Sequence, residues 1–118
     1  MAAVTTHQLL LALQQVCYHS PVVDRVEARV IDADTLSVRV YLTIKAAFLD
    51  VFYNLATAKT AFALVEGEKR IYGVDNAKLR WHVHPFDDPA QHMPCSPVQF
   101  EDFLAVVEAH YHKSSAQY

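Results

Sequence analysis

Hydrophobic and polar residues alternate along much of the chain after residue 24, with the period of two that is typical of half-buried β-strands. Val38, Val40 and Leu42, for example, alternate with Arg39 and Tyr41. The segments between the alternating runs contain Asp, Asn, Gly and Pro, which favour turns. The pattern predicts strands, linked by short turns, at residues 25–30, 38–45, 47–54, 59–66, 69–74 and 79–84.

A helical pattern precedes these strands. Thr6 is a candidate N-cap, and Pro21 prevents the helix from continuing beyond about Tyr18. Apolar residues follow at the i, i+4 and i+7 positions of one helix face, namely Leu9, Leu13 and Val16.

A second helical pattern follows the strands. Residues 85–97 contain four prolines and are expected to form an irregular loop. The run Ser96-Pro97-Val98-Gln99 has the form of a capping box. Its helix would bury one apolar stripe, and residues 113–118 are expected to be a polar tail. The stripe consists of Phe100, Phe103, Leu104 and Val107.

The order of these elements predicts an α+β fold. The chain of 118 residues has the size of one domain, so we assign residues 1–118 to a single unit. We expect an N-terminal helix, a mainly antiparallel meander of five or six strands and a C-terminal helix. The helices would cover one sheet face and leave the other polar. That polar face would carry Arg39, Tyr41, Lys45, Arg80, His82 and His84.

Composition narrows the function classes. Hydrophobic residues make up 53% of the chain and glycine occurs twice, which excludes disordered and collagen-like proteins. The formal net charge of −3 argues against a uniformly basic nucleic-acid coat. Positive charge is nevertheless concentrated between Lys69 and Arg80, where Asp75 is the one acidic residue.

Cellular location is inferred from the cysteines and the hydrophobic runs. Cys17 and Cys95 form no CxxC pair, and we expect free thiols in the reducing cytoplasm. The apolar run at residues 9–13 is too short to span a bilayer. No lysine or arginine precedes Arg25 to form the basic start of a signal peptide, so we expect neither export nor membrane insertion.

The segment between residues 70 and 86 carries the candidate chemistry. His82 and His84 would emerge side by side on one strand face, with Arg80 in line below them. Two imidazoles can supply an acid and a base near neutral pH, and Arg80 or Arg70 could hold a phosphate. These groups suffice for metal-free RNA cleavage. On spacing alone, a solvated polar strand face is the simpler explanation.

Further candidates for substrate binding surround this pair. Tyr72 would share a strand face with Arg70 and could stack on a base of single-stranded RNA, although a tyrosine with its hydroxyl at a rim is the common structural role. Asn76 could contact substrate, but it also suits a turn. The adjoining lysines are Lys69 and Lys78.

A zinc site is the competing chemical interpretation, and no cofactor is expected otherwise. The donor atoms of four residues could suit tetrahedral zinc. Their spacing matches no strong zinc signature, and Cys95 is equally well explained as a small apolar loop residue. The four residues are His82, His84, His92 and Cys95.

Two blocks of the sequence are distinctive, IYGVDN at residues 71–76 and WHVHPF at residues 81–86. In these blocks, and over most of the chain, the sequence resembles the TumE-type toxins of prokaryotic toxin-antitoxin modules. Where the family's turn carries a glycine before a lysine, this chain has Ala58 before Lys59, which leaves the geometry of that hairpin open.

The resemblance implies a small cytoplasmic growth inhibitor neutralised by a cognate antitoxin, often one with a helix-turn-helix domain. Because many toxins of this size cleave RNA, we expect a metal-independent endoribonuclease in which His82, His84, Arg80 and Arg70 act on the phosphate. A non-enzymatic inhibitor that binds through its exposed sheet face, and a zinc-supported protein, are the alternatives. The sequence leaves open the target RNA, the antitoxin and whether the chain forms a homodimer.

Overall fold

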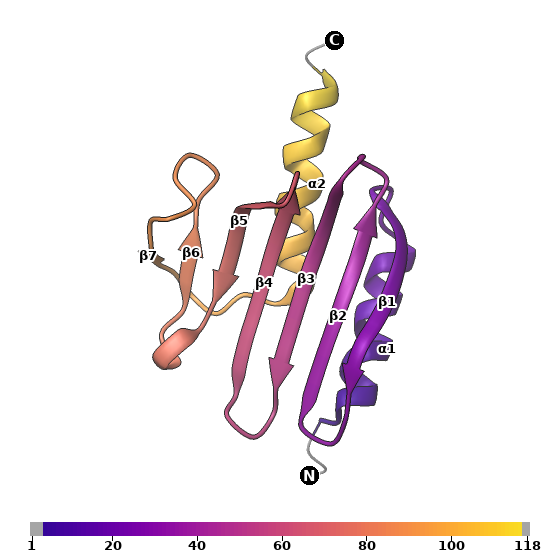
Figure 1. The fold of residues 1–118 in the computed structure, drawn as a ribbon, viewed down its shortest axis with the longest axis vertical. Coiled ribbons are helices and arrows are strands. Elements are labelled where there is room, and N and C mark those ends of the chain that lie inside the picture. The colour runs from indigo at the N-terminus through magenta and orange to yellow at the C-terminus, as the bar shows by residue number, and fades with distance from the viewer. Residues whose placement is uncertain (1–3, 117–118) are drawn as a thin grey trace.

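The computed structural model describes residues 4–116, except for the side chains of Leu79 and of residues 113–116. Within this range a sheet lies between two helices in sequence (Figure 1). Its elements are α1 (Thr6–Tyr18), β1 (Val23–Ile31), β2 (Thr35–Leu42), β3 (Ala47–Asn54), β4 (Lys59–Glu66), β5 (Lys69–Asp75), the 3-10 helix η1 (Ala77–Leu79), β6 (His82–His84), β7 (Met93–Pro94) and α2 (Phe100–Ala116).

The strands form one antiparallel meander in which spatial order equals sequence order, from β1 to β7. This confirms the α+β class and the flanking helices. The number of strands in the described residues is seven rather than five or six. The additional strand, β7, lies in the proline-rich segment that was expected to be irregular, where Met93 pairs with Val83.

The last predicted strand is shorter than expected. Residues 77–79 form η1, in which Lys78 has a φ of 56°, so that β6 begins at His82. Alternation of apolar and polar residues at 79–84 cannot distinguish an extended segment from a helical turn followed by three strand residues. The expected inner positions Trp81 and Val83 do pack against the core.

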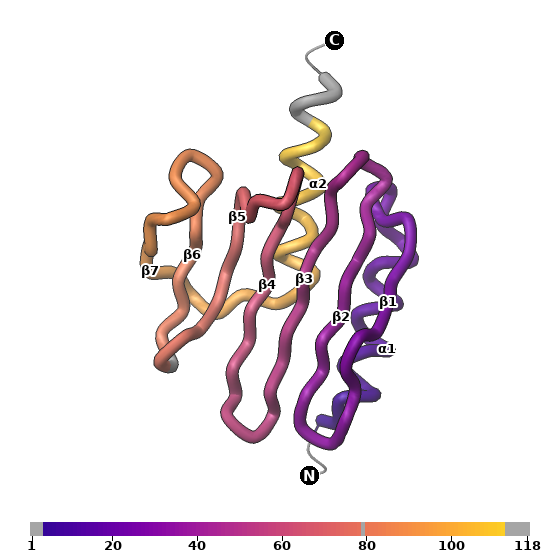
Figure 2. Tube along the Cα trace, in the orientation of Figure 1, coloured from indigo at the N-terminus to yellow at the C-terminus, as the bar shows by residue number. Residues whose placement is uncertain are grey.

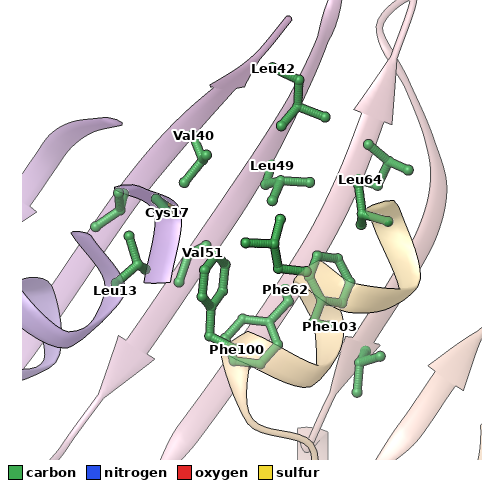
Figure 3. Packing of buried hydrophobic residues seen from close by; sticks show 14 of the residues in the cluster. Leu13, Cys17, Val40, Leu42, Leu49, Val51, Phe62, Leu64, Phe100 and Phe103 are labelled. Carbon is green, nitrogen blue, oxygen red and sulfur yellow. The ribbon is translucent and has the colours of Figure 1, made fainter. Parts of the chain in front are cut away.

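Both helices cover the same sheet face (Figure 1). Alternate strand residues point toward them, and Phe62 packs against Phe100 and Phe103 of α2, with ring centroids 5.8 and 5.4 Å away (Figure 3). All four residues of the predicted α2 stripe are buried, which confirms the stripe. The opposite side of the sheet, called the open face below, has neither helix over it.

The helix ends differ from the predicted ones. Thr5 caps α1 through a capping box with Gln8, whereas Thr6 is buried and its hydroxyl donates to the carbonyl of Asp32. The helix α2 begins at Phe100, so the capping box predicted at residues 96–99 does not form the helix start. The backbone of the expected polar tail is helical through Ala116.

The turn between β3 and β4 adopts a conformation that favours glycine. Ala58 has a φ of 61°, in the left-handed region. The side chain of Asn54 accepts hydrogen bonds from the backbone of Ala56 and Thr57 and stabilises the turn. The hairpin therefore forms with alanine at the position where the resembled family has glycine. Among the described residues, no helix is long and apolar enough to cross a membrane.

Candidate functional site

Two rows of side chains run across the open face because the strands are in register. One row consists of Arg39, Asp50, Ala63, Gly73 and His84. The neighbouring row consists of Ser37, Phe52, Ala61, Asp75 and His82. The structure thus confirms that His82 and His84 share a face with Arg39. It also brings Asp75 beside both histidines.

His84 is buried, with 2% of its surface exposed, and hydrogen-bonds through both ring nitrogens. Its Nε2 lies 2.8 Å from Oδ2 of Asp75, and its Nδ1 lies 3.4 Å from Nη2 of Arg70. A guanidinium donates and never accepts, so Nδ1 is the acceptor and Nε2–H donates to the carboxylate. Arg70 and Asp75 together select this neutral tautomer of His84.

Gly73 makes room for this chain of contacts. A Cβ at Gly73 would lie 3.3 Å from Cδ of Arg70 and 3.6 Å from Cδ2 of His84. The aliphatic part of Arg70 therefore crosses the strand over Gly73 to reach the imidazole. The same guanidinium nitrogen donates to the carbonyl of Pro89 at 3.1 Å, which ties the segment between β6 and β7 to the sheet.

Asp75 is the anionic end of the chain of contacts. Burial acts to raise the pKa of Asp75, but the Ala77 backbone N–H and the His84 side chain stabilise the carboxylate and outweigh burial, so the pKa lies below its usual value. Asp75 is consequently ionised at neutral pH. Its other carboxylate oxygen, Oδ1, accepts a hydrogen bond from the Ala77 backbone N–H at 3.0 Å.

Two further imidazoles lie against His84. The ring centroid of His92 is 4.4 Å from that of His84 and 5.8 Å from that of His82, in edge-to-face geometry. His92 is exposed, whereas Nδ1 of His82 is buried and receives no hydrogen bond from the described residues. An unpartnered buried polar atom is uncommon and points to a functional or solvent-linked position. We call His82, His84 and His92, with Arg70 and Asp75, the histidine cluster.

The predicted zinc set is only partly assembled. The three histidines approach one another, but Nε2 of His84 is bonded to Asp75. Burial, followed by the charge of Asp75, raises the pKa of the Cys95 thiol, which disfavours the thiolate that zinc requires. Within the described residues, no three His, Cys, Asp or Glu side chains are arranged to hold a metal ion. Zinc binding stays an untested prediction.

Tyr72 does not share a face with Arg70, contrary to the sequence-based expectation. The β4–β5 register shifts between Leu64 and Val65, so Tyr72 pairs with Leu64 while Arg70 pairs with Val65 on the other face. The Tyr72 ring stacks on Phe86 at 4.5 Å and on Phe103 at 5.6 Å, on the helix side of the sheet. Burial, with a contribution from Cys95, raises the pKa of its hydroxyl. Tyr72 is therefore a packing residue.

Asn76 also has a structural role. It is 9% exposed, its Oδ1 accepts from the Thr60 backbone N–H at 2.7 Å, and its Nδ2 donates to the Ala58 carbonyl at 2.7 Å. The side chain therefore holds the β3–β4 turn against the end of β5. Lys78 is exposed and lines a shallow hollow of about 310 Å³ with Asn76.

The basic stretch predicted between Lys69 and Arg80 is split by the fold. Lys69 begins β5 opposite Glu66, and its side chain is exposed at the end of the strand remote from η1. Arg80 is exposed and follows η1, four residues before His84. An extended segment of that length spans about 13 Å, so Arg80 is positioned nearer to His82 than to His84. Among the described side chains, Arg70 is the one predicted cation that forms a hydrogen bond with an imidazole of the cluster.

Comparisons with known proteins identify no relative. No family model, no curated protein and no solved structure matches the chain. The resemblance to TumE-type toxins therefore stays a prediction from the sequence.

Sequence reasoning missed Asp75 as the partner of His84 and considered His92 solely as a metal ligand. The pairing of Asp75 with His82 and of Gly73 with His84 depends on the β5–β6 register, which η1 obscures in the sequence. An acidic residue at the end of β5, before a histidine strand, was the available signal. It became informative once the two strands were known to pair.

Proposed function

We propose that this protein is the toxin of a toxin-antitoxin module and cleaves RNA at the histidine cluster without a metal ion. The observation that supports this best is the chain from Arg70 through His84 to Asp75, with the exposed ring of His92 against it. In this arrangement a guanidinium and three imidazoles lie within one small area of the open face, where the guanidinium could hold a phosphate.

The reaction needs one base and one acid. The base removes the 2′-hydroxyl proton, the 2′-oxygen attacks phosphorus, and the bond to the 5′-oxygen breaks as the acid donates a proton to it. His92, whose ring is exposed, and His82, which is half-buried with its ring centroid 5.8 Å from that of His92, are the imidazoles best placed to exchange these protons. The products are a 2′,3′-cyclic phosphate and a free 5′-hydroxyl.

His84 has a positioning role in this proposal, which changes the sequence-based pairing of His82 with His84. Its burial and its two hydrogen bonds keep it from direct contact with a substrate. It instead holds Arg70, whose guanidinium can donate to the equatorial phosphate oxygens as negative charge builds up on them. Asp75 fixes the imidazole in the tautomer that accepts from Arg70.

The proposal includes a cytoplasmic location and a cognate antitoxin, which the resemblance suggests is a protein with a helix-turn-helix domain. Cys17 and Cys95 are both free thiols in the structure, which fits a reducing compartment. A short helix-turn-helix reading frame next to the gene would support the module.

The test is cleavage of a short oligoribonucleotide by purified protein in the presence of a chelator. Wild-type protein should give the cyclic phosphate, with a bell-shaped dependence of rate on pH that reports the coupled imidazoles as a group. His82→Ala and His92→Ala should each slow cleavage by about 10²- to 10⁴-fold. His7→Ala, on the exposed side of α1, is the matched control and should retain the wild-type rate.

A non-enzymatic inhibitor that acts through the open face is the second candidate. The observation in its favour is that the aromatic rings Phe48 and Phe52 lie on this face, partly exposed and away from the helices. Induced expression with and without the antitoxin, followed by mapping of RNA ends, separates the two. Growth arrest with intact RNA would refute cleavage and favour inhibition by binding.

A further inference from the structure

Aromatic rings and cations are paired across the open face, on the strands before the histidine cluster. A charged group lies over each of three rings. Its distance to the ring centroid is 3.9 Å for Arg25 on Tyr41, 4.0 Å for Arg39 on Phe48 and 5.8 Å for Lys59 on Phe52. The guanidinium groups of Arg25 and Arg39 cover the rings of Tyr41 and Phe48, whereas the ammonium group of Lys59 lies farther from the ring of Phe52. A cation supported by an aromatic ring attracts flat, electron-rich groups that carry negative charge.

Small residues separate these rings from the histidine cluster. Ala61, Ala63 and Gly73 occupy the open-face positions of β4 and β5 between Phe52 on β3 and His84 on β6. A hollow of about 310 Å³ lies over this part of the sheet, and Arg29, Arg39, Phe52 and the two alanines are among its lining residues. Three strand spacings, about 14 Å, separate β3 from β6. A few nucleotides of extended RNA could span this distance across the small residues of β4 and β5.

The charge of this face differs from that of the whole chain. Its strand residues include five cations and four carboxylates, although the chain has a net charge of −3. They are Arg25, Arg29, Arg39, Lys59 and Arg70 against Asp24, Glu27, Asp50 and Asp75. The local excess of positive charge is complementary to a phosphate backbone.

We propose that the open face binds single-stranded RNA, with bases stacked on Phe52 and on the Arg39 guanidinium that Phe48 supports, and with the backbone directed over the alanines to the histidine cluster. The inference rests on the proposed function, because it supplies the substrate path to the same site. Stacking on exposed sheet aromatics requires unpaired bases, which a duplex keeps inside its stack. The substrate class is thus single-stranded rather than double-stranded RNA.

Binding can be measured separately from cleavage. A fluorescent single-stranded oligonucleotide with 2′-O-methyl groups lacks the attacking hydroxyl, so it can bind but cannot be cut. Anisotropy titration should show binding to wild-type protein and much weaker binding of a duplex of the same sequence. Phe48→Leu and Phe52→Leu preserve apolar volume but remove the ring, and each should weaken binding about 5- to 150-fold, the value of one base stacked on one ring.

Control variants test whether the open face, rather than nonspecific binding elsewhere on the protein, accounts for RNA affinity. Tyr18→Leu removes an aromatic ring that is 83% exposed on α1, and it should leave the affinity unchanged. Lys59→Gln should lower the slope of log affinity against log salt by about 0.7, the value for one phosphate contact on a single strand. Unchanged melting temperatures would show that the variants are folded.

The outcomes distinguish this inference from the proposed function. Binding that depends on Phe48 and Phe52, without cleavage of unmodified RNA, supports the path and refutes the nuclease. Cleavage with an unchanged KM in both leucine variants supports the nuclease and overturns the path. Equal affinity for duplex and single-stranded RNA would also overturn the proposed path. So would binding of a protein partner through the same rings without any binding of RNA.

Discussion

Two pairs of hydrogen-bonded polar side chains on the open face, each containing an aspartate, have different surroundings. Arg39 and Asp50 form a cross-strand ion pair with 27% and 45% of their side-chain surfaces exposed, whereas the side chains of His84 and Asp75 are 3% and 20% exposed. The segment that follows β6 accounts for the difference, since it carries Pro89 and His92 onto the second group and leaves the first open (Figure 2). Equivalent sheet positions thus give a solvated pair at one end and a buried network at the other.

The difference predicts unequal energetic roles. An exposed ion pair contributes about 0 to 1 kcal/mol, because water and salt screen it and side-chain entropy opposes it. A buried group that loses its partner costs about 1 to 3 kcal/mol, because it was desolvated on folding and is left unsatisfied. The partner of Asp50 is Arg39 of the neighbouring strand, so this pair depends on the register of β2 and β3.

The largest effect is expected for His84→Ala, which should lower the free energy of unfolding by about 2 to 4 kcal/mol. It removes a buried ring and leaves both Asp75 and Arg70 without their imidazole partner. Denaturant unfolding measures the change. His92→Ala, at an exposed ring of the same cluster, should stay within about 0.5 kcal/mol. Equal tolerance of both changes would mean that the network has no greater energetic value than the surface pair.

The second largest effect is expected for Asn76→Ala, which should lower the free energy of unfolding by about 2 kcal/mol. The side chain satisfies two backbone groups, the Thr60 N–H and the Ala58 carbonyl, and so connects the β3–β4 turn to the end of β5. Hydrogen exchange of the Thr60 amide should accelerate together with the loss of stability. Protection of that amide in the variant would contradict the proposed connection.

The third effect concerns acid stability and should amount to about 1 kcal/mol. The folded-state pKa of Asp75 is lowered, because contacts with the Ala77 N–H and His84 outweigh the opposing effect of burial. The stabilisation is present above the unfolded pKa of about 3.9 and is lost as the pH falls through the lower folded value. Asp75→Asn should therefore flatten the decline in stability below about pH 4. Urea melts between neutral pH and pH 2.5 measure this, with Asp24→Asn on exposed β1 as control.

The smallest effect is expected for Asp50→Asn, with a loss below about 1 kcal/mol. The pair with Arg39 is bidentate, at 2.9 and 3.3 Å, but it lies at the surface. Whatever stability it contributes should decrease in high salt. Thermal melts at low and high ionic strength test both points, and a salt-independent loss of several kcal/mol would place this pair in the same class as the buried network.

The sequence by itself determined the elements that depend on local periodicity. The bounds predicted for β3 and β4, residues 47–54 and 59–66, are those observed, because the turn-forming segments 54–58 and 66–68 delimit these largely apolar strands. The stripe of α2 was equally readable from its 3.6-residue spacing. Parity also predicted the common face of Arg39, His82 and His84, but it failed for Tyr72 and Arg70.

The tertiary structure decided which of these residues meet. The shift between Leu64 and Val65 sends Tyr72 to the helix side and Arg70 to the open face, and no local pattern announces a one-residue bulge. The contact of His84 with Asp75 needs the strand pairing across η1, and the burial of His84 needs the segment around Pro89 to fold back. Periodicity specifies the face of a side chain only within an uninterrupted strand. The neighbours and the exposure of that side chain depend on strand register, on bulges and on what covers the face.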